Sequence, residues 1–471
     1  MTTPAPPSPV DPTGIAGAPL LDADLLLGAP APTGAELEAN LPYAPASPLW
    51  VQRFKRWTGI FAFFFTAQGV VQASGLVAGL LFVNFLPLDE FALYTLASSV
   101  LVTLAFLTDL GSSSALLHYF HRSRTGEIEY GPFAAAVFSL RRRLFLLGAP
   151  VAVGALWVWG GEQKSPPMAL GIAIVCAVAA SWFQISGTLS VLNLRLEGRY
   201  AESYRAEVAG SLGRLALAAA LVALGWWLAT AALATAVAGA MLTAYASSAG
   251  RPAMDLGRER IAEARRAVLR YLAPTLPSAL YFAIQGQFVV WLAAAFGGTT
   301  SLAQVGALGR LGLLMGLFGG LIQVVFLPRL VQIADEHTFR WRYFQFGLFL
   351  AGLATLLFLA AALLPRPFLM LLGPRYSGLN HELLLVIATS GLALLGGYAV
   401  AVNNARSWNR WQPLAMVVFA LSQVFLVLEL PLSTTSGVLW FGLGSSAMGC
   451  LIQFAITVIG FARPRWVRWA T

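Results

Sequence analysis

The sequence predicts an all-α polytopic membrane protein with twelve transmembrane helices, arranged as two parallel repeats of six. Three observations carry this prediction: the composition, the number of long apolar windows and the distribution of basic residues. Hydrophobic residues make up 58% of the 471 residues and charged residues only 11%, and the mean hydropathy is +0.72. Soluble domains average about 45–50% apolar and about 25% charged residues. The apolar excess therefore requires a lipid environment.

Twelve windows have the length of about 20 apolar residues that a helix needs to cross the hydrocarbon layer. They are 58–86, 90–117, 143–160, 168–193, 206–224, 228–249, 272–296, 302–328, 343–364, 381–403, 412–432 and 438–461. A single helix over 208–250 would be about 65 Å long, so a turn is predicted at Gly225-Trp226-Trp227, where tryptophan suits the interface. Pro274 and Pro277 predict a bend near the start of the seventh window.

The basic residues test this assignment. If the N-terminus lies inside, 25 of the 30 Lys and Arg residues fall on predicted inner segments and three on outer loops. This asymmetry follows the positive-inside rule. It predicts that both termini are cytoplasmic, and it explains the pI of about 9.9 without nucleic-acid binding.

The same pattern divides the chain into segments. Residues 1–50 are rich in Pro and Ala and lack the basic start of a signal peptide, which predicts a disordered cytoplasmic tail. Residues 51–250 form a predicted N-lobe with six spans, 271–463 a C-lobe with six, and 464–471 a short cytoplasmic tail. The linker 251–270 predicts a basic amphipathic helix on the inner leaflet, with a solvated connector as the equal alternative.

The two halves are alike in register. A span with Gln68 and Gln72 precedes residues 87–120, and a span with Gln285 and Gln287 precedes residues 297–330. Because six spans is an even number, both halves point the same way. A binding site is then expected between the halves, near the middle of the membrane.

Enzymatic chemistry is not predicted. Cys176 and Cys450 lie inside apolar runs, the four histidines have no carboxylate at metal or triad spacing, and no phosphate-binding loop is present. We therefore expect no catalytic residues, no metal and no cofactor.

Residues 55–463 resemble the Wzx-like polysaccharide-flippase branch of the MATE/MOP exporter superfamily. The stretches that carry the resemblance, in the family's order and spacing, are 85–120, 269–297, 303–330 and 368–388. The resemblance implies a V-shaped bundle of two six-helix lobes in the bacterial inner membrane. It implies transport of undecaprenyl-diphosphate-linked oligosaccharides by alternating access, for cell-surface polysaccharides such as lipopolysaccharide. The implied partners are this substrate, the lipid bilayer and other polysaccharide assembly proteins. No nucleic acid is implied, and a monomer is expected.

Two arginines lie inside predicted spans. Arg310 is about nine residues, or about 14 Å, from the outer end of the eighth span. A guanidinium facing a cavity there suits a diphosphate, while a structural arginine paired with a carboxylate is the alternative. Arg214 in the fifth span is the second candidate, and its alternative is a local pair with Glu207, two turns earlier on the same face.

Polar side chains complete the candidate site. Gln68, Gln72 and Gln285 are expected to line a substrate cavity and hydrogen-bond sugar hydroxyls, with interhelical contacts as the alternative. Asp109, near the inner end of the second span, is the candidate for coupling to an ion gradient. Its alternative is a helix-end cap or a partner for an inner-side arginine.

Flippase and MATE-type ion-coupled drug antiporter remain the two functions to distinguish. The antiporter predicts buried carboxylates in the N-lobe core, where only Asp109 and Glu207 come near. A lipid II flippase predicts two further spans. A membrane glycosyltransferase or polymerase predicts a large outer loop, and the longest here, about 365–380, is short. The glycan and the coupling ion stay open.

Overall fold

A computed structural model describes residues 49–462, except 164, 254–255, 323–325, 332, 334, 407 and 409–410. The contacts below lie within the compact unit that begins at Phe61. The predicted tails, except for residues 49–50, fall outside the described residues.

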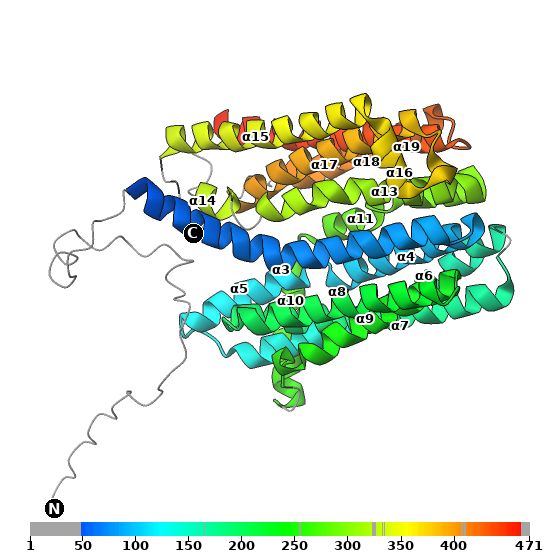
Figure 1. The fold of residues 1–471 in the computed structure, drawn as a ribbon. Coiled ribbons are helices and arrows are strands. Elements are labelled where there is room, and N and C mark those ends of the chain that lie inside the picture. Colours follow the sequence, from blue (N-terminus) through cyan, green and yellow to red (C-terminus); the bar gives the residue numbers. More distant parts are fainter. Residues whose placement is uncertain are drawn as a thin grey trace, which may run out of the picture. The chain divides into compact units, whose positions relative to one another are not determined.

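All regular elements of the described part are helical, and Figure 1 shows their order. The long helices are α3 (Leu49–Phe85), α4 (Leu88–Asp109), α5 (Ser112–Arg124), α6 (Tyr130–Glu162), α7 (Pro167–Leu196), α8 (Tyr200–Ala223), α9 (Ala229–Ala246), α10 (Arg258–Leu272), α13 (Gly298–Leu321), α15 (Glu336–Leu363), α17 (Asn380–Ala405), α18 (Gln412–Glu429) and α19 (Thr435–Ala462). The short ones are α11 (Leu276–Gln285), α12 (Phe288–Leu292), α14 (Leu327–Val331) and α16 (Pro365–Leu372). Eleven helices of the described part are long and apolar enough to cross a membrane, or twelve if one bent pair counts as a span. The predicted fold class is confirmed.

Local backbone geometry explains where the helices end. The predicted turn between the fifth and sixth spans is confirmed, because Gly225 has φ +78° and α9 begins only at Ala229. The predicted second span, in contrast, is not one helix. Leu110 and Gly111 both have positive φ, at 38° and 84°, and this left-handed pair separates α4 from α5.

The predicted seventh span is also interrupted. α11 ends at Gln285, α12 begins at Phe288, and a π-helical turn follows at Ala293–Gly297. α10 and α11 meet at 74°, across the three residues that contain Pro274, so the predicted bend is confirmed. Irregular backbone at membrane depth is tolerated where it is buried in protein or lines a cavity.

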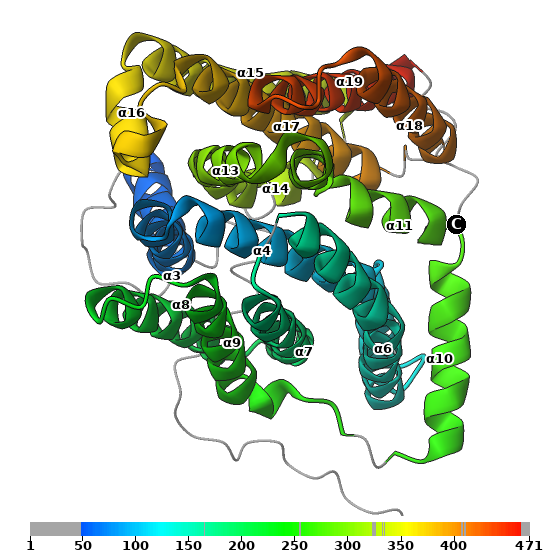
Figure 2. The same cartoon turned by 90° about the vertical axis from the view of Figure 1, so that its right-hand side faces the viewer.

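The helices pack in two groups. The amino-terminal group is α4–α9, in which α7, α8 and α9 make close contacts and α4 packs on α6 and α7. The carboxy-terminal group is α13–α19, centred on α17, which packs against α13, α15 and α19. The groups meet where α4 contacts α13. Figure 2 shows these two helices between α15 and α19 on one side and α7 and α9 on the other. The lobe boundaries at 51–250, 251–270 and 271–463 stay a prediction.

The linker helix α10 packs apolar residues against protein, and its predicted placement on the inner leaflet stays a prediction. Ala264, Val268 and Leu272 are buried, and the last two join a cluster with Leu116 of α5 and Phe138 of α6. Figure 2 shows α10 running beside α6. The surface of α5 and α6 covers part of the apolar face, whereas Leu269 and most of the arginines of α10 are exposed.

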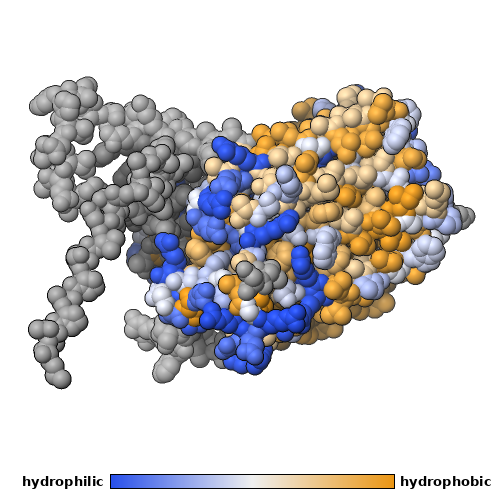
Figure 3. Space-filling model, turned by 90° about the horizontal axis from the view of Figure 1, so that it is seen from below, coloured by the Kyte–Doolittle hydropathy of each residue, from blue (hydrophilic) through white to orange (hydrophobic). Residues whose placement is uncertain are grey.

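Surface chemistry agrees with a membrane location. Leu147, Leu348 and Leu428 are each more than 70% exposed. Figure 3 shows one face on which hydrophobic residues cover a broad area and hydrophilic residues gather toward one end. Water-soluble monomers rarely expose apolar patches of this kind.

Candidate functional site

The two arginines inside the predicted spans meet at one tyrosine. Arg214 on α8 donates a hydrogen bond from Nη2 to the Tyr94 hydroxyl at 3.1 Å. Arg310 on α13 places its Cζ 5.4 Å from the centroid of the Tyr94 ring. Tyr94 lies on α4 and is only 1% exposed. We call Tyr94, Arg214 and Arg310 the Arg–Tyr cluster. It joins the two helix groups.

Small residues make room for this cluster. A Cβ added at Gly79 on α3 would lie 3.1 Å from Cδ of Arg310, and one at Gly239 on α9 would lie 3.0 Å from Cβ of Arg214. Phe82 packs edge-on against Tyr94, with ring centroids 5.1 Å apart. The neighbouring helices thus approach the arginine stems closely and hold the phenol ring in place.

The cluster lies deep in the predicted membrane. Arg214 is about 14 Å from the end of α8 and Arg310 about 18 Å from the start of α13, at about 1.5 Å per residue. The end of α8 lies near the start of α4, because Ala229, shortly after α8, donates its backbone N–H to Glu90. In a hydrocarbon layer about 30 Å thick, both positions are close to the midplane.

Neither arginine of the cluster has a carboxylate partner among the described residues. The ion pairs found there involve other arginines, and Glu207 pairs with Arg195 at 2.5 Å instead of Arg214. Nε of Arg214 and Nε of Arg310 are both buried without a hydrogen-bond partner. Both arginine side chains are half-buried, but these two Nε atoms are shielded from water, and a charge held at membrane depth without a counterion is costly. Two together form a site suited to an anion.

Packing around the cluster changes along α4 and α13. On α4 every residue from Phe91 to Ala97 is buried, and on α13 residues 301–308 are buried except half-buried Gln304. From Gly309 onward, α13 exposes Gly309, Leu313 and Gly316, which share one face, and Phe106 on α4 is 56% exposed. The helices where the two groups meet are therefore fully packed at one end and exposed at the other, and Arg310 lies at the transition.

Hydrogen bonds between the groups gather at the packed end. Gln163, after α6, donates to the carbonyl of Ala294 at 2.9 Å and accepts from Thr299 at 2.8 Å. Arg375 donates to the carbonyl of Leu86 at 2.7 Å. By the topology predicted from the basic residues, this closed end is the outer one.

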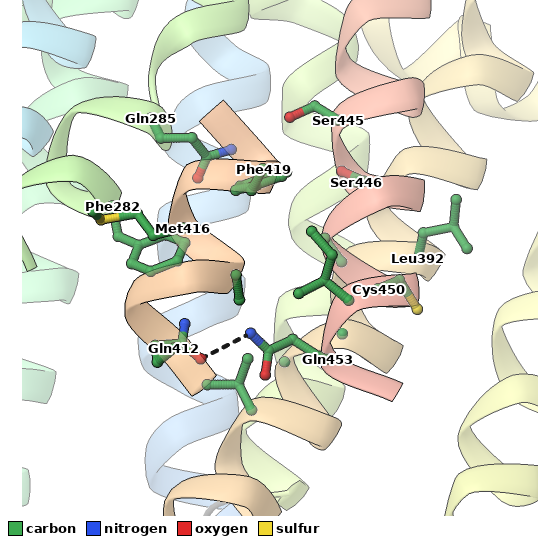
Figure 4. A pocket seen from close by; sticks show the side chains of 17 residues that line it. Phe282, Gln285, Leu392, Gln412, Met416, Phe419, Ser445, Ser446, Cys450 and Gln453 are labelled. Carbon is green, nitrogen blue, oxygen red and sulfur yellow. Dashed lines mark hydrogen bonds between the residues drawn. The ribbon is translucent and has the colours of Figure 1, made fainter. Parts of the chain in front are cut away.

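The predicted glutamines do not join the Arg–Tyr cluster. Gln68 is half-buried and Gln72 exposed, both on α3, and neither makes a hydrogen bond to a described residue. Gln285 lies at the end of α11 and lines a separate cavity in the carboxy-terminal group, shown in Figure 4. Their assignment as substrate-binding residues stays a prediction.

Asp109 is engaged in a buried network at the end of α4. It accepts hydrogen bonds from Arg141 and from the Ser113 hydroxyl, and the Arg141 side chain is only 5% exposed. Arg141 also donates to Ser112 at 2.8 Å and Thr188 at 3.3 Å. This is the arrangement expected of a helix-end partner for an arginine, and the ion-coupling role stays a prediction. Arg141 itself lies inside α6, which begins 13 residues before the predicted window.

Tyr94 was missed by the sequence reasoning. Its signal was weak: tyrosine favours the membrane interface, yet Tyr94 lies about 9 Å along its helix. A hydroxyl displaced inward in this way needs a polar partner, and Arg214 supplies it.

No family model and no curated protein matches the sequence. Solved structures match its fold. One is the inward-facing conformation of a multidrug resistance MATE family transporter of the MOP superfamily. Its sequence is 16% identical, the match covers 85% of this chain and 96% of the transporter chain, and the TM-score is 0.64. The lipid II flippase MurJ, in an inward closed conformation, is 14% identical over 85% of this chain and 89% of its own, with a TM-score of 0.65. The outward-facing conformation of a MATE transporter is 16% identical over 84% and 93%, with a TM-score of 0.54. The chain has the fold of these MOP-superfamily transporters.

Proposed function

We propose that this protein is a flippase that moves undecaprenyl-diphosphate-linked oligosaccharides across the bacterial inner membrane by alternating access, for cell-surface polysaccharide biosynthesis. The Arg–Tyr cluster carries the proposal, because two guanidinium groups without carboxylates lie at mid-membrane where the helix groups meet. The planar fork of arginine matches phosphate oxygens bidentately. A diphosphate is the anion that a lipid-linked glycan presents at this depth.

The charge at the site argues against the alternative, an ion-coupled antiporter of cationic drugs. Two arginines repel a cation, and the carboxylates expected for such an antiporter are engaged. Glu207 is paired with Arg195 and Asp109 with Arg141. The fold is shared by drug transporters and a lipid flippase, so the site chemistry has to distinguish them.

The cluster also suggests how binding couples to movement. Arg214 belongs to the amino-terminal group and Arg310 to the carboxy-terminal group. Without an anion their like charges oppose closer approach of the groups. A diphosphate bound by both neutralises this repulsion and favours closure of the open end. The diphosphate then shifts the conformational equilibrium, because it binds the closed state more tightly than the open state.

The direction of opening supports uptake from the cytoplasmic side. The packed end carries the hydrogen bonds of Gln163 and Arg375, and the exposed end is predicted to be inner. The higher TM-score to the inward-facing MATE structure, 0.64 against 0.54 for the outward-facing one, agrees with this direction. Cytoplasmic termini and the bacterial inner membrane are part of the proposal.

Depletion of the protein tests the function. Lipid extracts of depleted cells should contain undecaprenyl-diphosphate-linked oligosaccharide that stays on the cytoplasmic face. Re-expression of the unmutated protein should clear it, and re-expression with Arg214→Met and Arg310→Met should not. If no lipid-linked oligosaccharide accumulates while resistance to cationic drugs falls, the antiporter is the correct function.

A further inference from the structure

A second site lies in the carboxy-terminal group, and no charged residue lines it among those that the structure describes. A partly open cavity of about 150 Å³ is lined by residues of α11, α17, α18 and α19. Its polar side chains are amides and hydroxyls, including Gln285, Gln412, Gln453 and Ser446, and its aromatic walls are Phe282 and Phe419. Figure 4 shows Gln285 and Gln412 on one side of the cavity, facing Ser445, Ser446 and Gln453 of α19.

We propose that this cavity binds one sugar ring of the lipid-linked cargo, an inference that rests on the proposed function. Amides and hydroxyls pair with sugar hydroxyls, and aromatic rings pack against the apolar face of a pyranose. The described lining residues offer no carboxylate for a cation and no basic group for a phosphate. Its volume is about half of the ~300 Å³ at which drug-sized sites begin, which leaves room for a single ring.

Several polar groups in the cavity are available to a ligand. Gln285 and Ser446 make no side-chain hydrogen bond to any described residue. Gln412 accepts a long hydrogen bond of 3.3 Å from Gln453, which leaves its amide N–H groups available. Convergent polar groups without protein partners are typical of a ligand site.

The cavity wall is held in place by buried hydrogen bonds. The Tyr281 hydroxyl donates to Gln423 at 2.6 Å, and Gln423 donates to Ser445 at 2.5 Å. The Tyr281 ring meets Phe419 edge-on, with centroids 6.0 Å apart. This network fixes Phe419 and presents the Ser445 hydroxyl, so the site is preformed in the described structure.

The broken helix beside the cavity is an independent observation. Gln285 is the last residue of α11, and the interruption before α12 lies next to it. Such a break within a span is expected where the backbone lines a cavity. One helix, α17, belongs to both surroundings. It packs against α13, which carries Arg310, and its residues Leu392 and Val400 line the cavity.

Gly397 provides the sharpest test. It lines the cavity, and a Cβ added to it would meet nothing within 4 Å. The Cβ of Gly397→Leu therefore meets no neighbour, and the leucine side chain occupies space at the cavity wall. Gly352→Leu on α15 is the matched control, since Gly352 is also exposed with nothing within 4 Å of an added Cβ and does not line the cavity. Gln285→Leu removes an amide that has no partner in the described structure.

The experiment compares lipids with and without sugar. The full-length protein in nanodiscs is titrated with undecaprenyl diphosphate, with undecaprenyl-diphospho-N-acetylglucosamine and with undecaprenyl-diphosphogalactose. We expect at least one sugar-bearing lipid to bind about tenfold more tightly than undecaprenyl diphosphate, as two or three neutral hydrogen bonds allow. Gly397→Leu and Gln285→Leu should remove this gain and leave the affinity for undecaprenyl diphosphate unchanged, and Gly352→Leu should change neither.

Failure of this inference differs from failure of the proposed function. If undecaprenyl diphosphate binds in an arginine-dependent way but neither sugar adds affinity, the sugar site is wrong and the flippase stands. A gain that persists in Gly397→Leu also overturns the site. Equal weakening of all three lipids by Gly397→Leu would assign the cavity to the lipid chain. If no probe binds in an arginine-dependent way, the proposed function fails first.

Discussion

Replacement of Arg310 by methionine separates an anion site from a structural arginine. Methionine keeps much of the side-chain length and removes the charge. A hydrogen bond to a charged group contributes about 1.5–3 kcal/mol, so a lost contact to a diphosphate should weaken binding by about 10- to 150-fold. The diphosphate affinity of Arg310→Lys should lie between those of the unmutated protein and Arg310→Met, because the point charge of lysine lacks the bidentate fork of arginine. The Arg214→Met and Arg310→Met effects should be non-additive if one diphosphate bridges both residues.

Stability should respond differently from binding. Arg310 is half-buried and has no carboxylate partner in the described structure, so methionine removes the cost of a partly desolvated charge. It also removes a cation–π contact with Tyr94, which contributes about 0.5–2 kcal/mol. The two effects oppose each other, and we expect the stability to change by no more than about 1 kcal/mol, a small shift in Tm.

The assay uses purified protein in nanodiscs, with undecaprenyl diphosphate binding and thermal unfolding measured on the same samples. Arg142→Met is the matched control. Arg142 lies 4.5 Å over the Phe138 ring, outside the cluster, and its loss should leave lipid binding unchanged. Unchanged affinity in Arg310→Met would refute the anion site. A large loss of Tm in that variant would show that Arg310 is structural.

Three further outcomes follow from the contacts. Asp109→Asn should lower Tm, because a buried ion pair that loses one partner is destabilised by about 3–5 kcal/mol. The double variant Asp109→Asn, Arg141→Met should recover most of this loss. If Asp109→Asn has the same Tm as the unmutated protein, the pairing is contradicted. Gly306→Leu should force α4 and α13 apart, since a Cβ there would lie 2.3 Å from Oγ1 of Thr95. We expect a lower flux of lipid-linked oligosaccharide in proteoliposomes at normal protein level. An unchanged flux would show that this contact is dispensable. A nearby threonine hydroxyl and backbone amide lower the pKa of Asp335, which caps α15, so the cap is fully formed above the ordinary carboxyl pKa and is lost as pH falls through the lowered value. Hydrogen-exchange protection at the start of α15 should fall at that acidic pH, and a pH-independent protection would contradict the cap.

The spans could be predicted because they depend on the solvent. Apolar windows, the turn at Gly225 and the bend at Pro274 are local properties, and each appears in the structure close to its predicted place. Arg214 and Arg310 could be named as unusual for the same reason, since charge at membrane depth is costly wherever the helix packs.

The meeting of these two arginines could not be predicted. It depends on which helix faces which, and Arg214 and its partner Tyr94 are 120 residues apart in the chain. The break at Leu110 and Gly111 was hidden for a related reason, because the apolar window continues through it. The linker α10 shows the converse. Its amphipathic pattern was visible, but hydropathy does not distinguish a lipid surface from the surface of α5 and α6.

The anchored linker has a mechanical consequence. Val268 and Leu272 fasten α10 to the amino-terminal group, and only three residues separate it from α11. If the groups rotate relative to each other in a transport cycle, α10 stays with the amino-terminal group. α11, about 15 Å long, would then pivot about the three residues that join it to α10. A rotation of roughly 10° would swing its far end, which carries Gln285, by about 2.6 Å at that length. The cavity wall formed by Gln285 would then move whenever the exposed end of the α4–α13 contact opens or closes.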